Sequence, residues 1–217
     1  MSAPTRIYIE SWDRDSRIRQ LALDTGDSND ARHGLLEVVR AVVAGRAGST
    51  YNNARSSAGY NAWDYGVRRL REVFRERSDW VKYEENGVEG IVDHHTRIKV
   101  TVVSTDSACD PIHSPRNRTP KGPATEKIVD LSAQPSLFPI DGTLESADGY
   151  QFWEICVADD GNNVTAELSR PILFQSNHFL KFSERIFLVG PGEWEKVGIE
   201  SPDTNFPDIE PSVVRRK

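Results

Sequence analysis

Two early segments carry apolar residues at helical spacing. In residues 30–44 the aliphatic side chains that recur every three or four positions are Leu35, Val38, Val39, Val42 and Val43. In residues 58–77 one face collects the larger apolar side chains Trp63, Val67, Leu70 and Phe74. Because a helix turns once in about 3.6 residues, each pattern predicts an amphipathic helix.

Apolar and polar residues alternate in several short runs, and this alternation predicts strands. The runs cover residues 6–10, 80–85, 88–93, 97–104, 150–158, 164–169 and 179–189. Asn86 and Gly87 predict a tight hairpin, because a type I′ turn needs positive φ at both central positions. Pro171 has no N–H for a ladder hydrogen bond, so it should end its strand or place that strand at an edge. A short helix is expected to begin near Thr125.

The order of these elements predicts an α+β fold, with N-terminal helices followed by a mainly antiparallel β-sheet and no βαβ alternation. Residues 1–110 are expected to hold the helices and a three-stranded meander. Residues 111–192 form a β-rich half, joined through a proline-rich basic segment, and residues 193–217 form an extended C-terminal tail. The two halves can equally form one continuous domain.

The composition predicts a folded, acidic protein. The chain has 217 residues, a formal net charge of −6 and 37% hydrophobic residues, and it includes 5 Trp, 6 Tyr and 8 Phe. An acidic balance argues against a protein that coats DNA with its whole surface. No signal peptide is evident, no apolar run approaches the roughly 18 residues of a membrane span, and two cysteines cannot build a disulfide framework. We therefore expect a cytoplasmic protein with reduced thiols, no membrane attachment and no cofactor.

One proline-rich segment reverses the local charge. Residues 114–125 contain Arg116, Arg118 and Lys121 and no acid. Prolines stiffen such a loop, and a helix that starts at Thr125 would add free N–H groups with positive potential. The segment therefore predicts an anion-binding site that comprises Arg116, Arg118, Lys121 and Thr125. The alternative is an exposed connector that its charges keep solvated.

The second predicted helix adds Arg68, Arg71 and Arg75 to the candidate anion-binding residues. Two helices followed by a hairpin resemble part of a winged helix-turn-helix unit in topology, an arrangement that would turn these arginines toward DNA. Glu72 lies in the same helix and the hairpin is acidic, so pairing within the helix is the alternative.

The sequence leaves an enzymatic alternative open. It contains no phosphate-binding loop, dinucleotide fingerprint or nucleophile elbow. Candidate metal ligands are nevertheless present at His94, His95, Cys109 and His113. Candidate catalytic residues are Asp93, His94, His95, Glu154 and Glu167, the two glutamates lying on the arms of one predicted hairpin. The alternative for the glutamates is a polar sheet face that pairs with Arg170, Lys181 and Arg185.

The leading hypothesis is a non-catalytic accessory or regulatory protein that binds nucleic acid, another polyanion or an acidic partner surface through its basic proline-rich loop. The first alternative is a metal-dependent nuclease or phosphodiesterase. The second is a protein–protein interaction module that uses Trp194 as an anchor. The sequence favours a binding protein over an enzyme and leaves the oligomeric state open.

Overall fold

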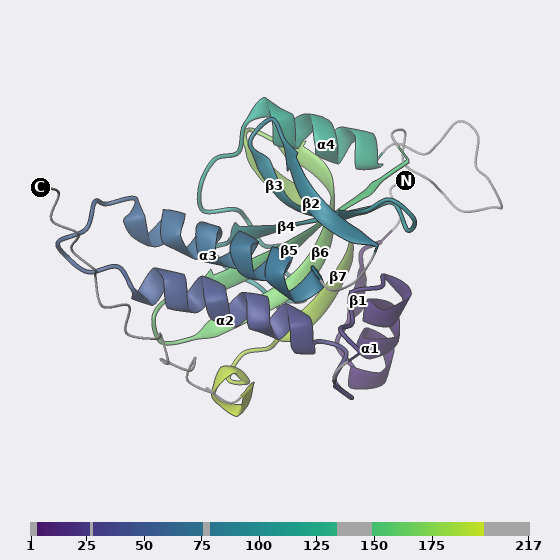
Figure 1. Cartoon of the computed structure of the whole chain (residues 1–217), viewed down its shortest axis with the longest axis horizontal. Helices are drawn as coiled ribbons and strands as arrows, with labels where there is room; N and C mark the ends of the chain where they lie inside the picture. The colour runs from purple at the N-terminus through teal and green to yellow at the C-terminus, as the bar shows by residue number, and fades with distance from the viewer. Residues whose placement is uncertain (1–3, 27, 76–78, 134–148, 198–217) are drawn as a thin grey trace, which may run out of the picture.

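A mixed β-sheet forms the centre of the structure (Figure 1). The computed structural model describes residues 4–26, 28–75, 79–133 and 149–197. Within these ranges the sheet has seven strands in the order β1-β7-β6-β5-β4-β3-β2. The strands are β1 Arg6–Tyr8, β2 Trp80–Glu85, β3 Val88–Asp93, β4 Ile98–Ser104, β5 Gln151–Asp159, β6 Val164–Gln175 and β7 His178–Val189. The helices are α1 Ser11–Gln20, α2 His33–Ala47, α3 Ser57–Phe74, α4 Pro123–Ala133 and the 3-10 helix Trp194–Val197.

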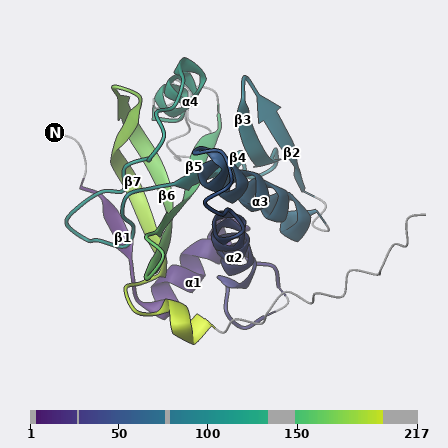
Figure 2. The same ribbon diagram turned by 90° about the vertical axis from the view of Figure 1, so that its left-hand side faces the viewer.

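The helices cover both faces of the sheet. Figure 1 shows α4 on one side of the strands and α2 and α3 on the other, and Figure 2 shows α2 and α3 between the two ends of the sheet in the turned view. The larger core packs α1, α2 and α3 against Trp153, Ile155 and Val157 of β5. A second core on the opposite face packs α4 against Phe152 and Cys156. β5 is therefore buried on both faces, which explains its nearly continuous apolar sequence.

Two glycines allow close approaches beside the sheet. A Cβ atom at Gly66 would lie 2.6 Å from Cγ2 of Val42 and 3.0 Å from Cγ1 of Val102, so α3 can pack tightly against α2 and β4. A Cβ atom at Gly90 would lie 1.9 Å from the carbonyl oxygen of Val100, so β3 can cross close to β4. Together they bring the start of β3, the second half of β4 and the middle of α3 into one neighbourhood.

The prediction of a mainly antiparallel sheet without βαβ alternation was wrong, although the class is α+β. β4 and β5 pair in parallel, from Ile98 opposite Gln151 to Ser104 opposite Val157, and α4 lies between them in the chain as the crossover of a βαβ unit. β1 also pairs in parallel, with β7. Direct pairing of strands that follow each other in sequence gives antiparallel ladders, whereas a crossover helix brings the next strand back in the same direction. Strands of both predicted ranges, 1–110 and 111–192, share this sheet, and the boundary itself stays a prediction.

Most predicted elements are present with shifted ends. The hairpin of β2 and β3 has the predicted limits, and Asn86 and Gly87 have φ values of 51° and 80°. The helix α1 was missed, because Ser11–Gln20 contains few apolar residues and only its buried Ile18 marks a core-facing side. Most of the predicted C-terminal tail, residues 198–217, lies outside the described residues.

Pro171 lies inside β6 rather than at its end. β5 pairs with β6 only as far as Ser169, and the register with β7 shifts on both sides of Pro171. The N–H that Pro171 lacks therefore lies in an irregular part of β6, where the strand has no regular hydrogen-bond ladder.

In the part of the chain that the structure describes, no helix has both the length and the apolarity that crossing a membrane requires.

Candidate functional site

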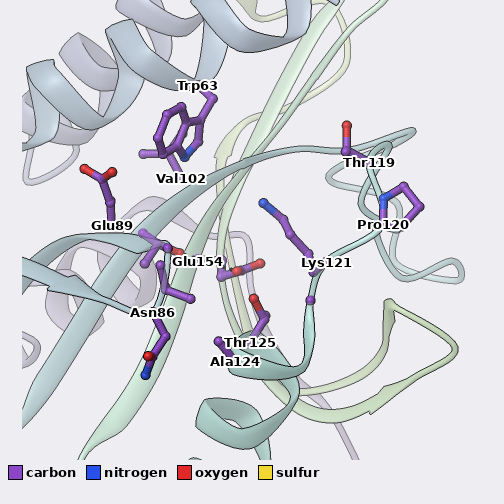
Figure 3. Close-up of a pocket in the computed structure, with 14 residues that line it drawn as sticks. Trp63, Asn86, Glu89, Val102, Thr119, Pro120, Lys121, Ala124, Thr125 and Glu154 are labelled. Atoms are coloured by element: carbon purple, nitrogen blue, oxygen red, sulfur yellow. Dashed lines mark hydrogen bonds between the residues drawn. The ribbon is translucent and has the colours of Figure 1, made fainter.

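A cavity of about 220 Å³ lies where β3 and β4 separate (Figure 3). The regular pairing of these strands ends at Gly90 opposite Thr101, and the residues beyond that point line the cavity. The walls come from α3, β3, β4, β5, the turn between β2 and β3, the segment that precedes α4 and the first turn of α4. The side chains that matter for its chemistry are Trp63, Glu89, Val102, Lys121, Thr125 and Glu154. We refer to this space as the Lys121–Glu154 cavity.

A row of polar residues crosses the sheet on its α4 face and reaches the floor of the cavity. The register places Thr101 of β4 beside Glu154 of β5, Glu154 opposite Ser169 of β6, and Ser169 opposite Arg185 of β7. Side chains alternate between the faces of a strand, and the neighbours Phe152 and Cys156 pack with α4, so Glu154 points to the α4 side as well. The polar side chains of this row are buried and need partners.

Glu154 is the member of this row that enters the cavity. Its side chain is buried, with 2% of the residue exposed, and Oε2 has no hydrogen-bond partner. The Thr101 hydroxyl donates to Oε1 over a long 3.4 Å. Burial raises the pKa of Glu154 to about 8, against the opposing effects of the Lys121 charge and the Thr101 hydroxyl. Glu154 therefore carries a proton at neutral pH and is uncharged.

Lys121 supplies a positive charge to the same space. Figure 3 shows its side chain extending into the cavity beside Glu154, with Trp63 and Val102 across from it and Thr125 below. No ion pair of Lys121 is found within the described ranges. The other acid of the cavity, Glu89, is paired with Arg71 at 2.8 Å. With Glu154 protonated, the cavity therefore has a net charge of about +1 from these groups.

The segment that carries Lys121 is held in place by Asn117, which is 2% exposed. Asn117 Nδ2 donates to the carbonyl oxygens of Thr119 and Asn177, at 2.7 and 3.0 Å, and Oδ1 accepts from the Phe179 N–H. The Lys121 N–H donates to the Asn177 carbonyl oxygen at 3.0 Å. This segment is thus fixed to the turn between β6 and β7. The backbone position from which the Lys121 side chain extends is therefore fixed as well.

The other predicted anion-binding residues of the connector lie elsewhere. Arg118 donates from Nε to the Thr105 carbonyl oxygen and from Nη2 to the Asp159 carbonyl oxygen. Its guanidinium group is therefore hydrogen-bonded to the backbone. Arg116 is exposed. Thr125 is buried in the first turn of α4 and lines the cavity, while its N–H bonds to the Gly122 carbonyl oxygen. The structure therefore brings together Lys121 and Thr125 from this group.

The helix arginines are distributed over different contacts. Arg71 donates to the carbonyl oxygens of Gly90 and Tyr83 as well as to Glu89, and so fastens α3 to the hairpin. Arg68 pairs with Glu72 at 2.8 Å along the exposed side of the helix, and Arg75 is exposed just after the helix end. Pairing within and beside the helix accounts for Arg68 and Arg71.

The predicted metal and catalytic residues around the histidines do not converge. Asp93 accepts from the His95 N–H and from the Thr96 hydroxyl, as the cap of a turn. His94 Nδ1 lies 2.7 Å from the Tyr150 hydroxyl, and His113 Nδ1 lies 2.9 Å from Asp110. The buried Cys109 thiol donates to the Ala166 carbonyl oxygen. Among the residues with described positions, no three His, Cys, Asp or Glu side chains are arranged to hold a metal ion.

Glu167, the second predicted carboxylate, belongs to a closed network. Its oxygens accept from Nε and Nη2 of Arg185, at 2.8 and 2.7 Å, and from the Ser169 hydroxyl and the Cys109 N–H, both at 2.6 Å. Arg185 also donates to the Asp110 carbonyl oxygen. A carboxylate with four donors and a paired charge has no capacity left for a ligand, so Glu167 supports the fold.

Sequence reasoning missed Trp63, Thr101 and Glu89 as parts of a site. Trp63 was assigned to the apolar face of its helix, and it does pack partly against the larger core. Thr101 reaches Glu154 only because β4 and β5 are parallel neighbours. No local pattern in the sequence signals that pairing.

Comparisons of the chain with models of protein families, with curated proteins and with solved structures find no match. The chemistry of the Lys121–Glu154 cavity is therefore the basis for a functional proposal.

Proposed function

We propose that the chain is a non-catalytic, cytoplasmic binding protein that holds an anionic group in the Lys121–Glu154 cavity, with Lys121 as the cationic contact. One observation carries the proposal: the Lys121 side chain extends into a partly enclosed space in which the neighbouring acids are neutralised. Glu89 is compensated by Arg71 at 2.8 Å. Glu154 is neutral because burial raises its pKa to about 8.

The size of the cavity favours a small ligand over a nucleic-acid strand. Its volume of about 220 Å³ lies below the roughly 300–1,000 Å³ that is usual for ligand sites. A nucleic-acid strand needs several cations along a groove, whereas Arg118 is occupied by backbone carbonyl groups. The basic proline-rich segment therefore acts through Lys121, on one anionic group at a time.

The proposal is tested by titrating the protein with benzoate and with inorganic phosphate and following the heat of binding near neutral pH. Lys121→Ala should weaken binding at least tenfold, because a hydrogen bond to a charged group contributes about 1.5–3 kcal/mol. Lys127→Ala is the matched control, since Lys127 lies exposed on α4 and does not line the cavity. Equal binding by the Lys121→Ala variant, or no binding of either probe by the unmodified protein, would refute the proposal.

A further inference from the structure

We propose that the Lys121–Glu154 cavity takes a monoanionic carboxylate with an apolar body, and that Glu154 stays protonated to donate a hydrogen bond from Oε2 to one carboxylate oxygen while Lys121 contacts the other. This inference rests on the proposed function and adds the ligand class and the role of the proton.

The unpaired oxygen of Glu154 is the first support. Oε2 is buried and has no partner among the described residues, and a buried polar atom without a partner is unfavourable. Glu154 lines the cavity, so its carboxyl group borders the space that a ligand would occupy. A protonated carboxyl group donates one hydrogen bond. The matching ligand group is therefore an acceptor, such as a carboxylate oxygen.

The charge of the cavity is the second support. Lys121 contributes +1, the Glu89–Arg71 pair is neutral, and a protonated Glu154 adds nothing. A monoanion restores neutrality in this site, whereas a phosphate dianion would leave an uncompensated buried charge. This balance favours a carboxylate over a phosphate monoester.

The side of the cavity across from Lys121 carries two apolar side chains beside the paired Glu89. Trp63 and Val102 face the space across from Lys121 (Figure 3). The exposed Tyr60 ring lies 5.8 Å from the Trp63 ring, centre to centre, and continues this aromatic surface outward. An apolar or aromatic body attached to the carboxylate would pack there and be removed from water.

Glu154 faces ionisable and polar groups from several elements. From the connector it faces Lys121, from β4 the Thr101 hydroxyl, and from α4 the Thr125 hydroxyl. The acids and bases that pack nearby are either paired, as Glu89 with Arg71 and Glu167 with Arg185, or exposed on α4, as Glu126 and Lys127. On β5 the buried Cys156 thiol has a pKa raised by burial and stays protonated. On β4, Lys99 Nζ lies over the rings of Tyr83 and Tyr150.

The proton should be visible in the pH dependence of binding. When Glu154 ionises, its negative charge repels the carboxylate and the donor is lost. Benzoate affinity should therefore be constant below the pKa of Glu154 and fall about tenfold per pH unit above it. At about pH 9, each bound benzoate should take up about one proton.

The experiment measures benzoate binding by calorimetry from about pH 6 to about pH 9, in buffers of different ionisation enthalpy. Benzamide, the uncharged analogue, should bind at least tenfold more weakly, and inorganic phosphate should bind more weakly than benzoate at about pH 8, where phosphate is mostly a dianion. Glu154→Gln keeps a neutral donor of the same shape, so this variant should bind benzoate over the whole range without a fall in affinity and without proton uptake. Circular dichroism of the variant verifies its fold.

The outcomes separate the two proposals. If Glu154→Gln keeps the pH dependence of the unmodified protein, or if phosphate binds more tightly than benzoate, the further inference is overturned while the anion site at Lys121 stands. If Lys121→Ala leaves the binding of both probes unchanged, the proposed function itself fails.

Discussion

Glu154 and Glu167 are two buried glutamates on the same face of one sheet, and their surroundings are opposite. Glu167 is 0% exposed and accepts four hydrogen bonds, two of them from Arg185. Glu154 is 2% exposed, accepts one long hydrogen bond from Thr101 and leaves Oε2 unpaired at a cavity. Burial alone therefore does not identify a binding group. The distinction lies in whether the surrounding chain already satisfies the carboxyl oxygens.

The difference follows from the position of each residue in the sheet. Glu167 lies on β6 between β5 and β7, where Arg185 can reach across from the neighbouring strand. Glu154 lies on β5 beside β4, and the β4 residue in register with it is Thr101, which is short and uncharged. The nearest cation, Lys121, comes from the connector and is directed into the cavity rather than into an ion pair. One carboxyl group is thus fully paired within the fold, and the other borders a cavity with one oxygen unpaired.

The largest effect that tests this contrast is expected from Glu167→Gln. This change leaves the Arg185 guanidinium buried without its counter-charge and should lower the free energy of unfolding by about 3–5 kcal/mol. Urea unfolding followed by tryptophan fluorescence measures it. Glu154→Gln is the matched control and should not destabilise the protein at neutral pH, because it replaces one neutral group by another. If Glu167→Gln lowers the free energy of unfolding by less than about 1 kcal/mol, the contrast between Glu167 and Glu154 does not hold.

The second effect concerns pH. The pKa of Glu154 rises from 4.5 to about 8 on folding, so between these values the unfolded chain has released a proton that the folded chain retains. The free energy of unfolding therefore decreases as the pH rises through this window, by about 1.4 kcal/mol per pH unit from this residue. Glu154→Gln lacks this contribution and should gain stability relative to the unmodified protein as the pH rises.

Unfolding curves of both proteins at about pH 5, 6 and 7 measure this difference. A constant difference in stability across that range would show that Glu154 ionises alike in the folded and unfolded chains.

The smallest effect compares the two hydroxyl partners. Ser169→Ala removes a 2.6 Å hydrogen bond to the Glu167 carboxylate and should cost about 1–3 kcal/mol. Thr101→Val removes a 3.4 Å contact with Glu154 and should change stability by less than about 0.5 kcal/mol, because so long a hydrogen bond is weak. Thermal or urea unfolding compares the two variants. Equal losses would mean that Thr101 supports Glu154 as firmly as Ser169 supports Glu167.

Local structure was readable from the sequence where short-range chemistry determines it. The Asn86-Gly87 turn and the apolar stripe of α3 depend on residues within one or two turns of each other, and both were predicted. The parallel pairing of β4 with β5 depends on the path of the chain through α4, and that of β1 with β7 joins opposite ends of the chain. Periodicity carries no information about either, so the prediction of a mainly antiparallel sheet failed there.

The candidate site was predictable in parts but not as a whole. Lys121 and Thr125 were identified from the basic segment, and Glu154 was identified separately as a candidate carboxylate. Their proximity follows from the parallel register and from the anchoring of the connector by Asn117. The contacts of Arg118 with backbone carbonyl oxygens were not predictable, because a cation in a loop looks alike in sequence whether it faces solvent or backbone carbonyl groups.

The pairing of β1 with β7 has a consequence for the order in which the chain assembles. The Thr5 hydroxyl donates to the Phe182 carbonyl oxygen, a contact that spans 177 positions of sequence. During synthesis, β1 leaves the ribosome first and can join β7 only when nearly the whole described chain has followed. The Asn117 contacts with Asn177 and Phe179 wait for the same late strand. The segment that carries Lys121 can therefore make these contacts only after residues 177–179 have been synthesised, and a chain truncated before them would lack a finished cavity.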